Sequence, residues 1–286
     1  MTLVQAVSRR SKSPAGIRSR DWVLGFAVFL CAAVVLLALI GPLISPHDPL
    51  QVDQLNPYAS PSPSHPLGTD DLGRDLLSRL LHGARLSTAG PALVVLVAAT
   101  VGTVVALLAA WFGGGVDTLV TRCLDLVASF PALLMAIVVA AAFGKGFIAP
   151  VLALSIAYIP FIARVLRPVF ARERNLPYVA AMSIQGISGW KASLFHVLPN
   201  VAPLILVQAT LIFGSALLDL AALSFLGLGF QPPTPEWGVM ASNGQGSVLA
   251  GFPQQSIYAS SAVAISVVAF NLLGERLSQR FEGKGR

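Results

Sequence analysis

Cysteine and charge are both scarce in this chain. Its 286 residues include only two cysteines, Cys31 and Cys123, and 11% of the residues are charged. Both cysteines fall within or beside apolar segments, which argues against a disulfide framework. Soluble domains carry about a quarter charged residues. A chain that is 55% hydrophobic, with a mean hydropathy of +0.74, therefore belongs in a lipid bilayer.

Motifs for catalysis, metal binding and nucleotide binding are also missing. Zinc-type clusters of Cys and His are absent, as are the HExxH and GxxxxGK[ST] patterns. In the segment from Gly186 to Lys191, a lysine stands where the second glycine of a P-loop belongs, so the chain cannot itself cradle nucleotide phosphates. We therefore expect no catalytic residue, no metal site and no bound cofactor. The four histidines are scattered along the sequence: His47, His65, His82 and His196.

Long apolar runs dominate what is present. A helix needs roughly 20 mostly apolar residues to cross a bilayer. The first run follows basic residues, as a signal peptide does, but it exceeds the roughly 7–15 residues of a signal-peptide core and no small-residue cleavage site follows it. We therefore expect an all-α membrane protein in which every run is retained as a span. Six stretches qualify: 22–44, 88–112, 119–143, 148–169, 201–230 and 256–273.

The basic residues predict how these spans are oriented, because cytoplasmic segments collect Lys and Arg. They gather in residues 1–21, between the fourth and fifth spans, and in the tail at 276–286. Both termini are therefore expected in the cytoplasm. The net charge of +6 then reflects topology, and we expect no nucleic-acid partner. The alternate segments keep few basic residues: Arg74, Arg79, Arg85 and Lys145.

The outward segment between the first two spans begins Pro-rich and ends in a helical pattern. Thr69 or Asp70 can cap such a helix, and the pairs Asp70–Arg74 and Asp75–Arg79 have the spacing that supports one. Two interpretations remain open: a helix lying flat on the membrane surface, or a helix that guides an external binding protein. Five leucines fall on one face: Leu72, Leu76, Leu77, Leu80 and Leu81.

The segment between the fourth and fifth spans predicts two short helices. Asn175 can cap the first, Pro177 suits its first turn, and Gly186 supplies the left-handed geometry that ends it. Ser188 can cap the second helix, which Pro199 is expected to stop.

An apolar face on this cytoplasmic segment is costly in water unless something covers it. That face carries Tyr178, Met182 and Ile184. Either it packs against the ends of the spans, or it docks into a cleft on a partner protein.

These residues resemble the cytoplasmic loop of ATP-binding-cassette (ABC) importer permeases. The pattern of that loop is Glu-Ala-Ala, then Gly, then Leu-Pro at fixed spacing. Two positions depart from it, since Ala180 stands where Glu is usual and Met182 where Ala is usual. The motif falls on Ala180, Ala181, Met182, Gly186, Leu198 and Pro199.

Three further stretches are similar to the dipeptide, oligopeptide and nickel permease group, and to the second (C-type) of its two permeases. They are HPLGTDDLGRDLLSRLLHGARLS at 65–87, LSFLGLGFQPPTPEWGVM at 223–240 and FNLLGERL at 270–277. The resemblance implies the type I ABC importer fold with six transmembrane helices. Residues 22–87 would hold the first helix and the outward loop, and residues 88–275 the transmembrane domain, with coupling helices at about 175–199.

The resemblance also implies a function. The chain would form half of an import pathway for short peptides in the bacterial cytoplasmic membrane. Its partners would be a homologous sister permease, two ATPase subunits that bind ATP and Mg, and an external substrate-binding protein, with membrane lipid around it. The chain would be no enzyme itself. Tyr178 and the motif residues would contact an ATPase. A nickel-chelate or other small-solute permease, and more remotely a secondary transporter, remain alternatives.

One ionisable residue lies deep in a predicted span. Asp219 falls in the fifth apolar stretch, and ionisable residues within membranes are functional candidates by default. It could bind a substrate amine or pair with the sister subunit. It could equally be a structural hydrogen-bond partner near Ser215 or Ser224.

Overall fold

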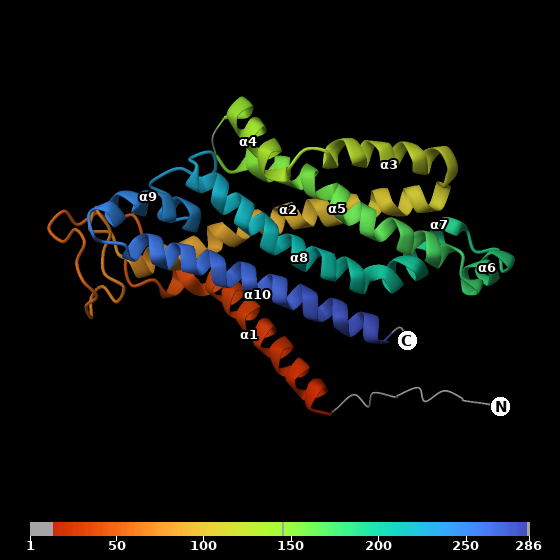
Figure 1. Cartoon of the computed structure of the whole chain (residues 1–286), viewed down its shortest axis with the longest axis horizontal. Coiled ribbons are helices and arrows are strands. Elements are labelled where there is room, and N and C mark those ends of the chain that lie inside the picture. Colours follow the sequence, from red (N-terminus) through yellow and green to blue (C-terminus); the bar gives the residue numbers. More distant parts are fainter. Residues whose placement is uncertain (1–13, 145, 285–286) are drawn as a thin grey trace, which may run out of the picture.

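The computed structural model describes residues 14–144 and 146–284, and the regular elements of this part of the chain are helical (Figure 1). An all-α fold is therefore confirmed. The elements are α1 (Pro14–Ile44), α2 (Leu76–Phe112), α3 (Gly114–Ala128), α4 (Ala132–Phe143), α5 (Ile148–Arg174), α6 (Pro177–Ile184), α7 (Gly189–Ala192), the π-helical turn η1 (Ser193–Val197), α8 (Leu198–Phe225), α9 (Trp237–Leu249) and α10 (Gln254–Lys284).

Several of these helices are long and apolar enough to cross a membrane. In the described residues five helices qualify, or up to six if the bent pair α3–α4 counts as one span. Their outer faces are apolar too: Trp22 on α1, Leu96 on α2 and Ile148 on α5 are each more than 60% exposed. Lipid tolerates such faces, whereas water does not. The chain is a multi-pass membrane protein.

The centre of the bundle is formed by α2, α5 and α8, which pack on one another. The fully buried residues Leu154, Ile162 and Leu166 of α5 lie in this core. Small residues let the helices approach closely, since a side chain on Gly102 of α2 would meet Ile162 at 3.0 Å. A second cluster joins α1, α9 and α10 to the start of α2 and includes Trp237.

The predicted surface helix before the second span is wrong as a separate element. The helix begins only at Leu76 and continues without interruption to Phe112. Its N-cap is Asp75, whose side chain accepts a hydrogen bond from the Ser78 N–H, so neither Thr69 nor Asp70 caps it. A continuous helix pairs most backbone groups across residues 76–112, although Pro91 within it donates no hydrogen bond, whereas a break would add the unpaired groups of two further helix ends.

The two ion pairs expected in this region have different outcomes. Arg74 Nε lies 2.7 Å from Asp70 Oδ2, which confirms that pair. Arg79 turns to Asp70 as well, at 3.5 Å, and no ion pair joins it to Asp75. Asp75 is already engaged by the cap and by His65, so Arg79 finds its carboxylate elsewhere.

The predicted third span at 119–143 is broken. Helices α3 and α4 meet at an angle of 75° around Pro131, so they are one bent span or a re-entrant loop. Proline disfavours the helical conformation of the residue before it, here Phe130, and this ends α3. The fifth predicted span, 201–230, ends earlier than expected: its helix α8 stops at Phe225.

The two ends of the bundle differ in character. Figure 1 shows α9 and the loop between α1 and α2 at one end, with α6, α7 and the last turns of α10 at the other. At the first end Glu236 caps α9 and accepts a hydrogen bond from Ser87 Oγ of α2 at 2.8 Å. Burial raises the pKa of Glu236. Glu236 and Trp237 are both buried, so they bind the α8–α9 loop to α2.

Candidate functional site

The short helix α6 starts where its sequence requires. Pro177 occupies its first turn, as predicted, where a missing N–H costs nothing. The expected cap is wrong: Leu176 is the N-cap of α6, and Asn175 instead closes α5. The Asn175 side chain donates back to the Ala171 carbonyl at 3.0 Å, so it serves the preceding helix.

Gly186 ends α6 in the way its position predicted. Its φ is +78°, in the left-handed region that favours glycine. The Gly186 N–H bonds to the Ser183 carbonyl at 3.1 Å and the Ile187 N–H to the Met182 carbonyl at 3.0 Å. This pair of bonds is a Schellman motif, which closes the helix and fixes the direction of the next segment. The turn is therefore a defined corner.

The second helix does not stop at Pro199. Helix α7 runs through the π turn η1 directly into α8, so residues 189–225 form one continuous helical segment. The Leu198 N–H bonds to the Ser193 carbonyl, a π-type bond that widens the helix just before the proline. Pro199 then sits in the first turn of α8. α7 and α8 are thereby parts of one continuous helical segment.

The predicted loop residues form an exposed ridge. Tyr178, Met182 and Leu198 are half-buried, whereas Ala180, Ala181, Gly186 and Pro199 are exposed. Ile184, at the tip of α6, is 87% exposed, and Trp190 is 52% exposed. Packing against the chain's own spans therefore leaves part of the apolar face uncovered. That is the arrangement expected of a docking surface.

Contacts that sequence reasoning missed hold this ridge to the bundle. A side chain on Gly189 of α7 would overlap Cζ2 of Trp111, at the end of α2. The Arg174 guanidinium lies 5.3 Å from the centre of the Trp111 ring and donates to the Ala110 carbonyl at 3.0 Å. Nothing in the sequence around Gly189 indicates that it contacts Trp111, which lies 78 positions earlier. Gly189 of α7 and Arg174 of α5 therefore both pack against Trp111 at the end of α2.

Tyr178 fastens α6 to the neighbouring helices. Its hydroxyl donates to Glu173 Oε2 of α5 at 2.9 Å and accepts from Asn200 Nδ2 of α8 at 3.3 Å. Desolvation, with the Glu173 bond adding to it, raises the pKa of Tyr178. A neutral hydroxyl thus bridges α5 and α8 beneath the exposed ridge.

Asp219 lies far from this ridge, inside α8. Its Oδ2 accepts a hydrogen bond of 2.8 Å from the hydroxyl of Tyr158 on α5. Ser215 donates to the Leu211 carbonyl and Ser224 accepts from the Phe230 N–H. The structure thus gives the carboxylate a partner on a neighbouring helix that the sequence did not single out.

The structure thus shows an apolar helical bundle able to span a membrane, with an exposed helical corner at one end. Residues 102–284 match the family described as binding-protein-dependent transport system inner membrane component. The chain belongs to this family. By that description its members are inner-membrane components of transport systems.

Curated relatives are similar over most of their length. A di/tripeptide transport system permease protein of Pseudomonas aeruginosa is 37% identical over 91% of this chain and 88% of its own. A probable D,D-dipeptide transport system permease protein of Escherichia coli K12 is 35% identical, covering 92% and 90%. A glutathione transport system permease protein of Pectobacterium atrosepticum is 36% identical, covering 88% and 83%.

Proposed function

We propose that this chain is the second permease subunit of an ATP-driven importer and forms half of its pathway for short peptides. It crosses the bacterial cytoplasmic membrane six times, with α3 and α4 as one bent span and both termini in the cytoplasm. Its partners are a sister permease, two ATPase subunits and an external binding protein. It binds no cofactor itself, since ATP and Mg belong to the ATPases.

The observation that carries this proposal is the exposed ridge from Tyr178 to Pro199. A flexible loop would lose a partner's movement as its own entropy. Here three features restrict the conformations of the ridge: the Schellman motif at Gly186, the packing of Gly189 on Trp111 and the continuous helix α7–η1–α8. An ATPase that moves the ridge therefore also moves the ends of α2, α5 and α8. Those three helices form the core of the bundle.

The peptide substrate rests on the relatives. Two of those described above are named for dipeptides or tripeptides, and a third for glutathione, itself a small peptide. A nickel-chelate or other small-solute importer is the second candidate. In either case we propose that Asp219, which is half-buried and accepts a hydrogen bond from Tyr158 of α5, borders the pathway or the sister subunit.

Ile184→Asp tests the docking surface. The substitution places a carboxylate at the tip of α6, where we propose that an apolar cleft covers it. An unpaired polar group buried in this way costs about 1–3 kcal/mol, so binding of the ATPase subunits should weaken roughly 5- to 150-fold. Copurification of the assembled complex and ATP-driven uptake of a labelled dipeptide by proteoliposomes measure the loss.

Leu55→Asp is the matched control. Leu55 is 91% exposed, like Ile184, but lies in the loop between α1 and α2. This variant should assemble with the ATPases as the wild type does. Equal ATPase binding by the wild type and by Ile184→Asp would refute the docking role. Transport by the chain without any ATPase would refute the importer function itself.

Gly186→Pro tests the corner. Proline cannot adopt a φ of +78° and has no N–H for the Ser183 carbonyl. We expect the variant to insert normally while ATP hydrolysis no longer drives uptake. Unchanged uptake per ATP hydrolysed would count against coupling through this turn.

A further inference from the structure

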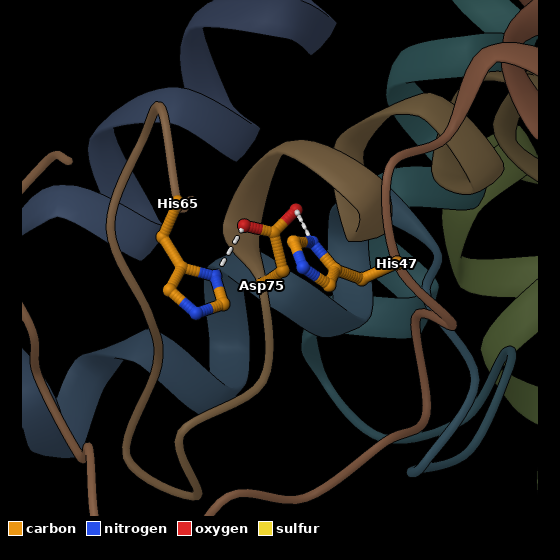
Figure 2. A group of neighbouring side chains, drawn as sticks. All are labelled: His47, His65 and Asp75. Carbon is orange, nitrogen blue, oxygen red and sulfur yellow. Dashed lines mark hydrogen bonds and ion pairs between the residues drawn. The ribbon is translucent and has the colours of Figure 1, made fainter. Parts of the chain in front are cut away.

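Two histidines and an aspartate meet at the start of α2, at the opposite end of the molecule from the docking ridge. His47 follows the end of α1, His65 lies in the Pro-rich loop, and Asp75 is the N-cap of α2. His65 Nδ1 lies 3.0 Å from Asp75 Oδ1, and His47 Nδ1 lies 3.9 Å from Asp75 Oδ2. Figure 2 shows the two imidazole rings approaching the carboxylate from either side.

The spacing of the three donors fits a single metal ion. One ligand atom from each residue can be chosen so that all lie within 4.8 Å of one another. Around a tetrahedral zinc ion with bonds of about 2.0–2.2 Å, ligand atoms stand roughly 3.4 Å apart. His65 Nδ1 lies 3.0 Å from one oxygen of Asp75 and His47 Nδ1 lies 3.9 Å from the other, so each nitrogen stands near this separation from its own carboxylate oxygen. The three residues are therefore close enough together for one ion to lie among them.

A second layer of hydrogen bonds holds the carboxylate in place. Asp75 is 2% exposed, and its Oδ2 accepts from the Ser78 N–H at 2.8 Å and from Ser78 Oγ at 2.6 Å. The same Ser78 Oγ accepts from the backbone N–H of His47 at 3.1 Å. Outer partners of this kind orient metal-binding side chains. Ser78 thus positions two of the three residues.

One donor atom of the cluster has no partner within the described chain. His47 Nδ1 is buried and makes no hydrogen bond, even though the His47 and His65 rings stack with centroids 4.8 Å apart. A buried polar nitrogen left unpaired costs about 1–3 kcal/mol. The nearby cations do not compete for Asp75, because Arg74 and Arg79 both face Asp70. A metal ion between the rings and the carboxylate would satisfy the orphaned nitrogen.

We propose that His47, His65 and Asp75 bind a divalent transition-metal ion, for which zinc fits the donor set. Imidazole nitrogen and carboxylate oxygen are ordinary zinc ligands, and three of them leave one coordination position open. The ion joins the end of α1, the Pro-rich loop and the first turn of α2, and so fixes the shape of the loop between them. The sequence-based expectation of no metal site arose because 17 intervening residues separate the histidines, whereas the fold brings them together.

Metal titration of the full-length chain tests the site. The protein carries an affinity tag without histidine, is purified in detergent and is stripped with a chelator. Zn²⁺ is then titrated in competition with a chromogenic chelator, and Co²⁺ binding is followed by its visible absorbance. We expect one equivalent of tightly bound metal. His47→Ala and His65→Ala should each weaken binding at least about tenfold.

His82→Ala is the matched control, since His82 lies two turns into α2 and bonds only to the Ser78 carbonyl among the described residues. It should bind zinc as the wild type does. Zn²⁺ should raise the Tm of the wild type and of His82→Ala but not of the double variant His47→Ala/His65→Ala.

The His47 variant also separates metal binding from folding. His47 Nδ1 makes no hydrogen bond within the described residues, so His47→Ala removes no hydrogen bond of that atom, and the metal-free variant should still unfold cooperatively. Zn²⁺ should raise its Tm less than it raises the wild-type Tm. Stoichiometric binding that survives loss of both histidines would overturn the proposal. Wild-type binding no tighter than that of the double variant would do so as well.

Discussion

Gly189→Ala perturbs the joint between α7 and α2. The added Cβ would overlap Cζ2 of Trp111 and lie 3.1 Å from Cε2, whereas carbon atoms in contact prefer about 3.5–4.0 Å. Either the indole or α7 must therefore move by about 1 Å. The indole is held by Arg174 on its face. Overpacking of this kind costs about 1–3 kcal/mol, which is roughly a 5- to 150-fold change in the folding equilibrium.

Gly115→Ala separates this clash from the ordinary effect of alanine in a helix. Gly115 lies in α3 with nothing within 4 Å of an added Cβ, so alanine there should stabilise by up to about 1 kcal/mol. In denaturant unfolding in detergent, the free energy of unfolding of Gly189→Ala should be lower than that of Gly115→Ala by the cost of overpacking. Uptake by the assembled importer should fall only in Gly189→Ala.

Trp111→Leu provides the complementary change, because it removes the ring atoms that Cβ would meet. The double variant Gly189→Ala/Trp111→Leu should be more stable than the two single effects predict, since the methyl group then enters vacated space. Additive effects, or equal stabilities of Gly189→Ala and Gly115→Ala, would refute the packing of α7 on α2.

Two further predictions concern carboxylates that bond to a neighbouring helix, Glu236 and Asp219. Burial raises the pKa of Glu236 above its ordinary 4.5, so the folded state binds the proton of this carboxyl group more tightly than the unfolded state does. The stability gained from this proton is complete below pH 4.5 and is lost as the pH rises through the pKa of the folded state. Glu236→Gln should remove this decline in thermal unfolding measured against pH, and an unchanged profile would contradict it. In a double-mutant cycle measured by unfolding, the coupling energy between Tyr158→Phe and Asp219→Ala should be about 0.6 kcal/mol, the average for hydrogen bonds between helices in membranes. Strict additivity would mean that the bond contributes nothing.

Local patterns predicted the elements that depend on local rules. The apolar runs gave the membrane helices, because a bilayer accepts only long apolar stretches. Gly186 and Pro177 gave both ends of α6, since each acts through its own backbone geometry. The prediction that Pro199 stops the second helix was wrong, because it too relied on a local backbone preference. Its helix-stopping tendency is local, and the π turn before it removed the conflict.

The amino-acid sequence by itself determined that this protein lies in a membrane, where most of its long helices run and which segment forms the helical corner at Gly186. These features follow from composition and from single-residue backbone preferences. Only the tertiary structure decided that Trp111 receives Gly189, that Tyr158 meets Asp219 and that two distant histidines share Asp75. Such pairings depend on how helices pack across the bundle, and packing geometry leaves no periodic signal along the chain.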